Sequence, residues 1–260
     1  MFNWSLEQQQ PFGLIVQAQQ PGANLDSIIV SLLEQWVDVN RVVILRRFAP
    51  LVGAELPQFC MRLGEIQEWD FGAVNELRAK PDAQNYLYTT REVPFHWDGA
   101  FAGRVPHYIF FHCDVAPRSG SGGETLFCDS NRMLLSAPLE QRELWANTKI
   151  TYTTEKVVHY GGTFTSPMIC THPVSGENVV RFAEPVADLN PVSLEIRGIP
   201  EEDQPAFLDD IHERLHADTV CYRHEWLAGD VVIADNFVLL HGRTEFAQLS
   251  ERCIRRVNIL

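Results

Sequence analysis

The chain has 260 residues, of which 45% are hydrophobic and 21% charged, and its formal net charge is −13. This length suits one large domain or two small ones and can bury a substantial core. The acidic balance and the lack of any Lys/Arg run argue against a general binder of nucleic acid or of an anionic membrane, because both need clustered positive charge.

The N-terminal residues MFNWSLEQQQPFGL lack the basic region and apolar core of a signal peptide. No apolar stretch approaches the length of a membrane span. The six cysteines form no CxxC pair and lie scattered along the chain, at Cys60, Cys113, Cys128, Cys170, Cys221 and Cys253. This pattern predicts a cytoplasmic protein with reduced thiols, with a disulfide scaffold as the alternative.

The first third of the chain is predicted to alternate between helix and strand. Apolar residues at helical spacing predict a helix over 25–40, with Asp26 as its N-cap. Residues 41–48 have the pattern of a short buried strand, and a second helix is predicted over about 53–64.

The rest of the chain is dominated by short β-rich runs separated by Gly/Pro/Ser turns. Strands are predicted within 107–116, 124–129, 149–155, 163–173, 178–185, 218–226, 230–241 and 252–260. Helices are predicted at about 130–146 and 203–217. Many short strands favour a sandwich or barrel with helices packed outside, a mainly β (α+β) fold, and the simplest organisation is a single domain over residues 1–260.

The stretch VPFHWDGAF places His96 two residues before Asp98. On a strand, side chains at i and i+2 share a face, so the imidazole and the carboxylate would point the same way. They supply two of the three ligands of the facial triad that binds ferrous iron. Such a pair by itself also fits a structural role, and the third ligand must come from elsewhere.

The segment 229–260 supplies that third ligand. His241 ends an apolar strand, and Arg252 opens another strand eleven residues later. Pairing of these two strands would bring Arg252 close to His241. A guanidinium there fits the distal carboxylate of a dicarboxylic acid whose 2-oxo group chelates the metal. The implied chemistry is oxygen activation at ferrous iron.

Thr125 follows a glycine-rich turn, SGSGGETLF, over 119–127. The glycines are interpreted as turn residues. The Thr125 hydroxyl is a candidate donor to the carboxylate of the oxo acid.

A rival motif, HERLH, runs from His212 to His216 and fits the H-E-x-x-H pattern of zinc peptidases. On a helical wheel Phe207, Leu208, Ile211 and Leu215 form the apolar face, and Glu213 points almost opposite to it. The segment is therefore interpreted as a surface helix, with a zinc peptidase as the alternative function.

Four motifs together resemble the taurine dioxygenase-like family: H-x-D at 96–98, GGET at 122–125, DNFVLLHG at 235–242 and R-x-x-x-R at 252–256. The resemblance implies a double-stranded β-helix (jelly-roll) core and an enzyme that uses Fe(II), 2-oxoglutarate and molecular oxygen. It also implies that His96, Asp98 and His241 bind iron and that Thr125 and Arg252 hold 2-oxoglutarate.

A closer resemblance, from about residue 11 to the end, is to the isonitrile-pathway oxygenases of paerucumarin and rhabduscin biosynthesis. It rests on WDFGAV, VPFHWDG, FHCDVAP, VIADNFVLLHGRTEFA and RRVNI. It implies desaturation of a tyrosine-derived isocyano acid, supplied by a partner isonitrile synthase, to an α,β-unsaturated or decarboxylated vinyl isonitrile. The substrate carboxylate is expected at Arg256, with Arg104, Lys156 and His159 as further candidates, and the ring near Phe101, Tyr160 and Phe95.

Two further alternatives keep this fold. One is a hydroxylase of a sulfonate or another small anion. The other is a non-catalytic binding protein.

Overall fold

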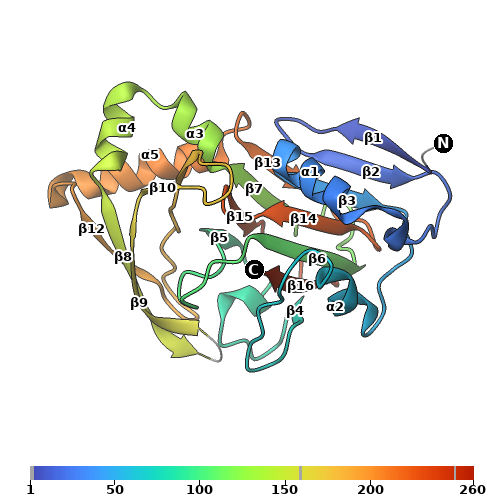
Figure 1. The fold of residues 1–260 in the computed structure, drawn as a ribbon. Helices are drawn as coiled ribbons and strands as arrows, with labels where there is room; N and C mark the ends of the chain where they lie inside the picture. The colour runs from blue at the N-terminus through green and yellow to red at the C-terminus, as the bar shows by residue number, and fades with distance from the viewer. Residues whose placement is uncertain (1–2, 158–159, 249) are drawn as a thin grey trace.

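Two β-sheets packed face to face form the centre of the molecule. The computed structural model describes residues 3–157, 160–248 and 250–260, without the side chains at 156, 157 and 160 (Figure 1). Buried side chains from both sheets meet in one core cluster between them, which includes Phe111, Val232 and Ile254 from one sheet and Phe127 and Leu239 from the other. The described part is therefore a sandwich.

The larger sheet has seven strands in the order β1-β2-β3-β14-β6-β16-β4, and every pair is antiparallel except β2 with β3. Its strands are β1 (Trp4–Gln8), β2 (Leu14–Ala18), β3 (Val42–Arg46), β4 (Asn75–Arg78), β6 (Tyr108–Val115), β14 (Val231–Asp235) and β16 (Cys253–Ile259). The smaller, four-stranded sheet has the order β13-β7-β15-β5. Its strands are β5 (Val93–His96), β7 (Thr125–Asp129), β13 (Cys221–His224) and β15 (Leu239–Arg243).

The central strand β14 shows why the sequence folds this way. Its first four residues, Val231 to Ala234, are apolar without alternation, and all five residues of the strand are buried. Val231 and Ile233 face the cluster under the helices, whereas Val232 and Ala234 face the cluster between the sheets. A strand that is covered on both faces needs such a continuous apolar run.

Helices cover the outer faces of the sandwich (Figure 1). Helices α1 (Val30–Asn40) and α2 (Glu55–Cys60) contribute Leu33, Val37, Leu56 and Phe59 to the cluster under the large sheet. Helices α3 (Ser130–Ser136), α4 (Leu139–Ala146) and α5 (Gln204–His216) pack at the small sheet. There Phe207, Ile211 and Leu215 of α5 belong to a third core cluster, which also includes Leu126 and Leu240 of that sheet.

Two smaller β elements flank the sandwich. The three-stranded sheet β12-β8-β9 is formed by β8 (Lys149–Val157), β9 (Tyr160–Pro167) and β12 (Ser193–Arg197). Strands β10 (Ile169–Thr171) and β11 (Asn178–Val180) form a hairpin. Short 3₁₀ helices lie at η1 (Leu25–Ser27), η2 (Tyr86–Tyr88) and η3 (Glu201–Asp203).

The prediction of a mainly β fold with outer helices is confirmed, but several element boundaries were wrong. The helix expected over 25–40 is a 3₁₀ turn followed by α1, and Asn24, not Asp26, caps the turn through its side chain. The helix expected over 130–146 breaks between α3 and α4, because Pro138 cannot continue the helix.

The expected pairing of the strands that carry His241 and Arg252 is also wrong. β15 belongs to the small sheet and β16 to the large one, so the two strands face each other across the sandwich. The loop between them crosses from one sheet to the other and does not close a hairpin.

All six cysteines are free thiols. In the part of the chain that the structure describes, no helix combines the length and apolar character needed to cross a membrane.

Candidate active site

His96, Asp98 and His241 converge between the two sheets. Their ligand atoms all lie within 4.8 Å of one another. Oδ1 of Asp98 is 3.7 Å from Nε2 of His96 and 3.9 Å from Nε2 of His241. The two imidazoles are neighbours because β5 and β15 pair antiparallel with His96 opposite His241. Two nitrogens and one carboxylate oxygen thus face a common point.

Asp98 reaches this point from a turn and not from a strand, because β5 ends at His96. Asn236 fixes the turn: its Oδ1 accepts from the Asp98 backbone N–H at 2.9 Å, and its Nδ2 donates to the carbonyls of Asp98 and Pro106. Gly99 closes the turn at φ +98°, where an added Cβ would lie 2.5 Å from the carbonyl oxygen of Arg104. Asn236 was not among the residues expected at the site, although it stands within DNFVLLHG.

The protonation state of the imidazoles suits a metal. Nδ1 of His96 lies 2.8 Å from the carbonyl oxygen of Pro94, which can only accept, so this nitrogen carries the proton and Nε2 offers its lone pair. Burial lowers the pKa of His96 and lowers that of His241 well below its ordinary value. Both rings are therefore neutral at neutral pH, the state that binds a metal.

Arg256 holds the carboxylate of Asp98, the third member of this group. Its Nη1 donates to Oδ1 of Asp98 at 3.1 Å and lies 3.0 Å from Oδ2. Burial by itself would raise the pKa of Asp98, but the positive charge of Arg256 leads the opposing effects, and the net pKa lies below its ordinary value. The carboxylate is thus ionised and oriented as a hard oxygen ligand. Arg255, the neighbouring arginine, instead binds Asp114.

A small cavity lies beside His241 and is lined by the residues predicted to hold 2-oxoglutarate. Its lining includes His96, Thr125, His241, Arg252 and Arg256. Arg252 is buried, its Nε donates to the carbonyl of Gly123, and burial lowers its pKa to about 10. Within the described part of the chain, no carboxylate lies within ion-pair distance of Arg252, so the cavity presents a protonated guanidinium that lacks an anion.

Thr125 is oriented to donate into this cavity. Its Oγ1 accepts from Nε1 of Trp226 at 3.0 Å and from Nη2 of Arg252 at 3.3 Å. Both lone pairs are therefore used, which leaves the hydroxyl proton available to a ligand carboxylate. The structure thus brings together the two residues expected at 2-oxoglutarate.

The glycines before Thr125 do more than form a turn. Gly122 and Gly123 adopt φ +83° and +88°. A Cβ at Gly122 would lie 1.9 Å from the carbonyl oxygen of Glu245, and one at Gly123 would lie 3.2 Å from Cδ of Arg252. The pair lets the loop after β15 and the Arg252 side chain approach the start of β7.

A larger cavity opens on the other side of His96 and Asp98. Aromatic and aliphatic side chains dominate its wall, which also includes Arg256 and Asn258. Its aromatic members are Trp69, Tyr86, Trp97, Phe101 and Tyr152. Tyr152 was not expected here; it is buried and bonded to the backbone of Ala183. The cavity suits an aromatic molecule with one anionic group directed at Arg256.

The other residues expected at the substrate divide into four groups. Phe101 lines this cavity. Arg104 does not: its side chain is 60% exposed and pairs with Glu65, because it lies on the loop that leaves the Asp98 turn. His159 and the side chains of Lys156 and Tyr160 lie outside the described residues, and Phe95 is buried against α5 in the core.

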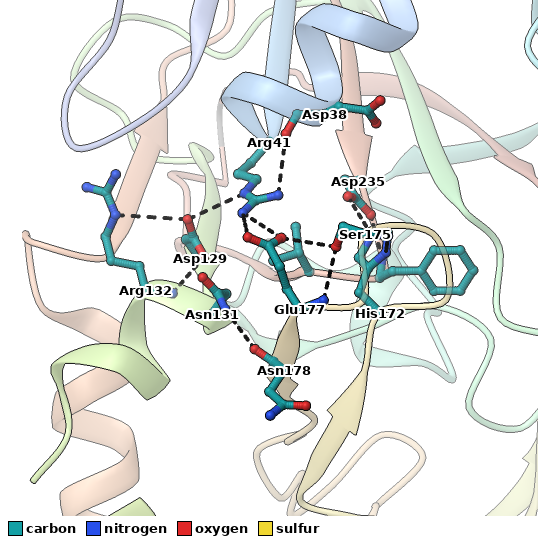
Figure 2. Close-up of polar contacts among 12 residues, drawn as sticks. Asp38, Arg41, Asp129, Asn131, Arg132, His172, Ser175, Glu177, Asn178 and Asp235 are labelled. Carbon is teal, nitrogen blue, oxygen red and sulfur yellow. Dashed lines mark hydrogen bonds and ion pairs between the residues drawn. The ribbon is translucent and has the colours of Figure 1, made fainter. Parts of the chain in front are cut away.

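A second histidine–aspartate group, formed by His107, His172 and Asp235, is poorly suited to a metal. Nδ1 of His172 accepts from the backbone N–H groups of Val174 and Ser175, so Nε2 carries the proton and donates to Asp235 at 2.9 Å (Figure 2). The lone pair that a metal would need is not available at Nε2. This contact ties the β10–β11 hairpin to the end of β14.

The same hairpin carries an ion pair to α1. Arg41 follows α1 and binds Glu177 through two bonds of 2.8 and 2.9 Å (Figure 2). This second network is structural, and the function therefore rests on the group at His96, Asp98 and His241.

Comparison with known proteins agrees with this geometry. Residues 7–258 match the model of the family "Taurine catabolism dioxygenase TauD, TfdA family". The chain is 42% identical to 3-((Z)-2-isocyanoethenyl)-1H-indole synthase of Fischerella ambigua, over 99% of this chain and 96% of that protein. It is 33% identical to tyrosine isonitrile desaturase of Pseudomonas aeruginosa, over 96% of this chain and 88% of that protein.

A solved structure has the same fold. It is described as PvcB, an Fe, alpha-ketoglutarate dependent oxygenase from an isonitrile synthetic pathway, and it matches with a TM-score of 0.82 and 30% identity, over 98% of this chain and 90% of that one. The double-stranded β-helix expected from the sequence is thereby confirmed.

Proposed function

Since the chain belongs to the TauD/TfdA family of Fe(II)- and 2-oxoglutarate-dependent dioxygenases, we propose that it desaturates an aromatic isocyano acid to an unsaturated isonitrile. The observation that carries the proposal is the aromatic cavity that meets His96, Asp98 and Arg256 in a chain related over nearly its whole length to isonitrile-forming enzymes.

We assign the cofactor ligands residue by residue. His96, Asp98 and His241 would hold Fe(II), since two neutral imidazoles and an ionised carboxylate fit this ion and leave further positions open. Arg252 and Thr125 would hold the distal carboxylate of 2-oxoglutarate. When bound, iron, 2-oxoglutarate and oxygen supply the oxidising power that removes hydrogen from the substrate.

The protein's own part is positioning. Trp97, Phe101 and Tyr152 would flank the aromatic ring, and Arg256 would attract the substrate carboxylate. Arg256 already binds Asp98, so it couples the position of the substrate to the orientation of a metal ligand. The substrate thereby loses two hydrogens, or one hydrogen and its carboxylate as carbon dioxide, and forms a double bond next to the ring.

The parent amino acid of the substrate is proposed to be tyrosine or tryptophan. The sequence resemblance favours a tyrosine-derived acid, as does the relative named a tyrosine isonitrile desaturase. A tryptophan-derived acid is the second candidate, because the relative named an isocyanoethenyl indole synthase is 42% identical to this chain. That relative's product name contains an ethenyl group and no carboxylate, so a decarboxylating outcome belongs to this candidate.

Three further assignments accompany the proposal. An isonitrile synthase would supply the substrate. The protein would act in the cytoplasm, in keeping with its free thiols. Residues 1–260 would form one domain, which the family match over 7–258 supports.

Product analysis tests the proposal. The iron-loaded enzyme is incubated with 2-oxoglutarate, oxygen and, separately, the isonitriles of tyrosine and tryptophan, with taurine as the comparison substrate. We expect an isonitrile product lighter by two hydrogens, or by the elements of formic acid, with one succinate for each product. Oxygen gained on taurine, with both isonitriles unchanged, would instead establish a hydroxylase of small anions.

A further inference from the structure

The histidine motif that the oxygenase site leaves unused also meets a carboxylate. His212 and His216 stand one turn apart on α5, and their ligand atoms lie within 4.8 Å of each other and of a carboxylate oxygen of Glu184. Glu184 belongs to the segment after β11, 28 residues before His212. We propose that these three side chains form a second metal site, which takes a zinc-class divalent ion.

The geometry supports convergence on one ion. Oε1 of Glu184 is 2.6 Å from Nδ1 of His212 and 3.9 Å from Nε2 of His216. The two imidazole centroids are 4.4 Å apart, with the rings inclined at 45°. The 2.6 Å contact is a hydrogen bond, so Nδ1 of His212 carries the proton when no metal is bound. Because this side chain is 62% exposed, the proton can move to Nε2 and free Nδ1 for an ion, whereas two backbone donors fix the opposite tautomer in His172.

The carboxylate is held in place from behind. Oε2 of Glu184 accepts from the backbone N–H of Phe95 at 2.8 Å, and the N–H of Glu184 donates to the carbonyl of Phe95 at 2.9 Å. Such outer hydrogen bonds orient a ligand and raise metal affinity. The Phe95 ring also contacts His216 edge-on at 4.9 Å, which fixes that imidazole.

The site is open on one side. The side chain of Glu184 is 10% exposed, that of His216 31% and that of His212 62%. An ion can therefore enter from solvent, and water can complete its coordination. Two imidazoles and one carboxylate with an open fourth position suit Zn²⁺, whereas Mg²⁺ and Ca²⁺ prefer oxygen ligands throughout.

The surrounding charge also favours a cation. Besides Glu184, the groove around the histidines is lined by three carboxylates and two guanidinium groups, from Glu92, Asp209, Glu245, Arg223 and Arg243. An ion at this place would join α5 to β5 through Glu184 and Phe95. It lies outside the His96–Asp98–His241 group, although Glu184 also lines the substrate cavity.

This assignment differs from the zinc-peptidase alternative. A peptidase of this motif uses the glutamate inside the motif as its base. Here that residue, Glu213, is exposed and outside the ligand group, and the third donor comes from Glu184.

Zinc stoichiometry tests the inference. Metal-free full-length protein is titrated with Zn²⁺ against a chromophoric chelator. We expect two equivalents for the unaltered protein, one for Asp98→Ala, one for the double variant His212→Ala/His216→Ala, and none when all three changes are combined. Glu213→Ala on the same helix is the matched control and should keep two equivalents.

A milder variant guards against misfolding. Glu184→Gln keeps an oxygen acceptor for the Phe95 N–H and removes the ligand charge, so the zinc affinity of the second site should fall at least tenfold without a lower melting temperature in chelator. In the Asp98→Ala background, Zn²⁺ should raise the melting temperature, and the His212/His216 changes should abolish that rise.

The proposal is overturned if the double histidine variant still binds two equivalents of zinc. It is also overturned if the unaltered protein binds one equivalent and Asp98→Ala abolishes that binding. If the unaltered protein binds one equivalent, and only the His212 and His216 changes remove it, the second site is supported and the result counts against the iron assignment. The two proposals thus fail independently.

Discussion

Arg252 is a buried cation whose bonds within the described chain go to neutral oxygens, the carbonyl of Gly123 and the hydroxyl of Thr125. A buried charge without a counterion is costly, and a ligand carboxylate relieves that cost. Asp98 differs, because its buried carboxylate is paired with Arg256 at 3.0 Å, and it also faces two neutral imidazoles. At the scale of single residues, the site thus offers a cation at Arg252 that suits a ligand carboxylate and an anion at Asp98 that suits a metal ion.

Replacing Arg252 with glutamine should raise the KM for 2-oxoglutarate by about 10- to 100-fold. The reason is the loss of a charge-assisted hydrogen bond, which contributes about 1.5–3 kcal/mol. Succinate formation at varied 2-oxoglutarate gives the measurement. Arg255→Gln is the matched control, since this arginine binds Asp114. An unchanged KM in Arg252→Gln would remove Arg252 from the cofactor site.

Arg256→Gln should weaken Fe(II) binding by about 10- to 100-fold, the usual cost of losing a residue that orients a metal ligand. Its Nη1 lies within 3.1 Å of both Asp98 oxygens, and its charge leads the effects that keep the pKa of that carboxyl low. Competition with a ferrous chelator measures the affinity. If iron affinity stays constant while the KM of the isocyano acid rises, Arg256 serves the substrate alone.

At the scale of elements, the site depends on where β5 stops. The strand ends at His96, and the turn that carries Asp98 is bonded to Asn236, which follows β14 in the opposite sheet. The three proposed ligands are thus positioned jointly by β5, β15 and a contact across the sandwich.

Asn236→Ala should destabilise the protein by about 2–4 kcal/mol, because three hydrogen bonds are lost and the Asp98 N–H stays buried. Iron affinity should fall with it, since the Asp98 turn is released. Urea unfolding and iron titration provide the two readouts. Asn147→Ala, which removes one exposed bond to Glu143, is the control. Equal effects of both changes would mean that Asn236 has no special role in the turn.

Elements with a strong local pattern were predicted from sequence, and those that depend on partners were not. The buried strands β3, β6, β7 and β14 carry apolar runs that mark them without structural knowledge. The edge strand β4 has the sequence NELR, which signals no strand; it exists because β16 pairs with it. Tertiary pairing outweighs local propensity at such positions.

The site shows the same division. His96, Asp98, His241, Thr125 and Arg252 stand in motifs that sequence comparison detects, and the structure gathers them at adjoining cavities. Tyr152, Asn236 and Glu184 were missed, because their roles arise from contacts between segments distant along the chain. No spacing rule links Glu184 to the histidines of α5.

At the scale of the whole molecule, the sandwich buries many histidines as neutral groups. Outside the active site, burial is the first cause that lowers the pKa of His107, His112 and His224. His112 and His224 are each 1% exposed. A fold that keeps these rings uncharged depends on pH, because the unfolded chain protonates its histidines near their ordinary pKa of about 6.5.

The free energy of unfolding should therefore decrease as the pH falls below about 6.5. Below that pH the unfolded chain binds protons that the folded histidines, with lowered pKa values, do not yet accept. Each such histidine lowers the free energy of unfolding by up to about 1.4 kcal/mol per pH unit, until the pH reaches its pKa in the folded state. Urea unfolding between about pH 7.5 and 5.5, with chelator present to keep every histidine metal-free, gives the measurement.

His224→Gln should flatten the slope of the free energy of unfolding against pH, because one buried imidazole no longer titrates on unfolding. For this comparison each protein is normalised to its stability at the alkaline end. Constant or rising stability across this interval would mean that the buried rings accept protons in the folded state, through acceptors such as Asp230, 3.4 Å from His224.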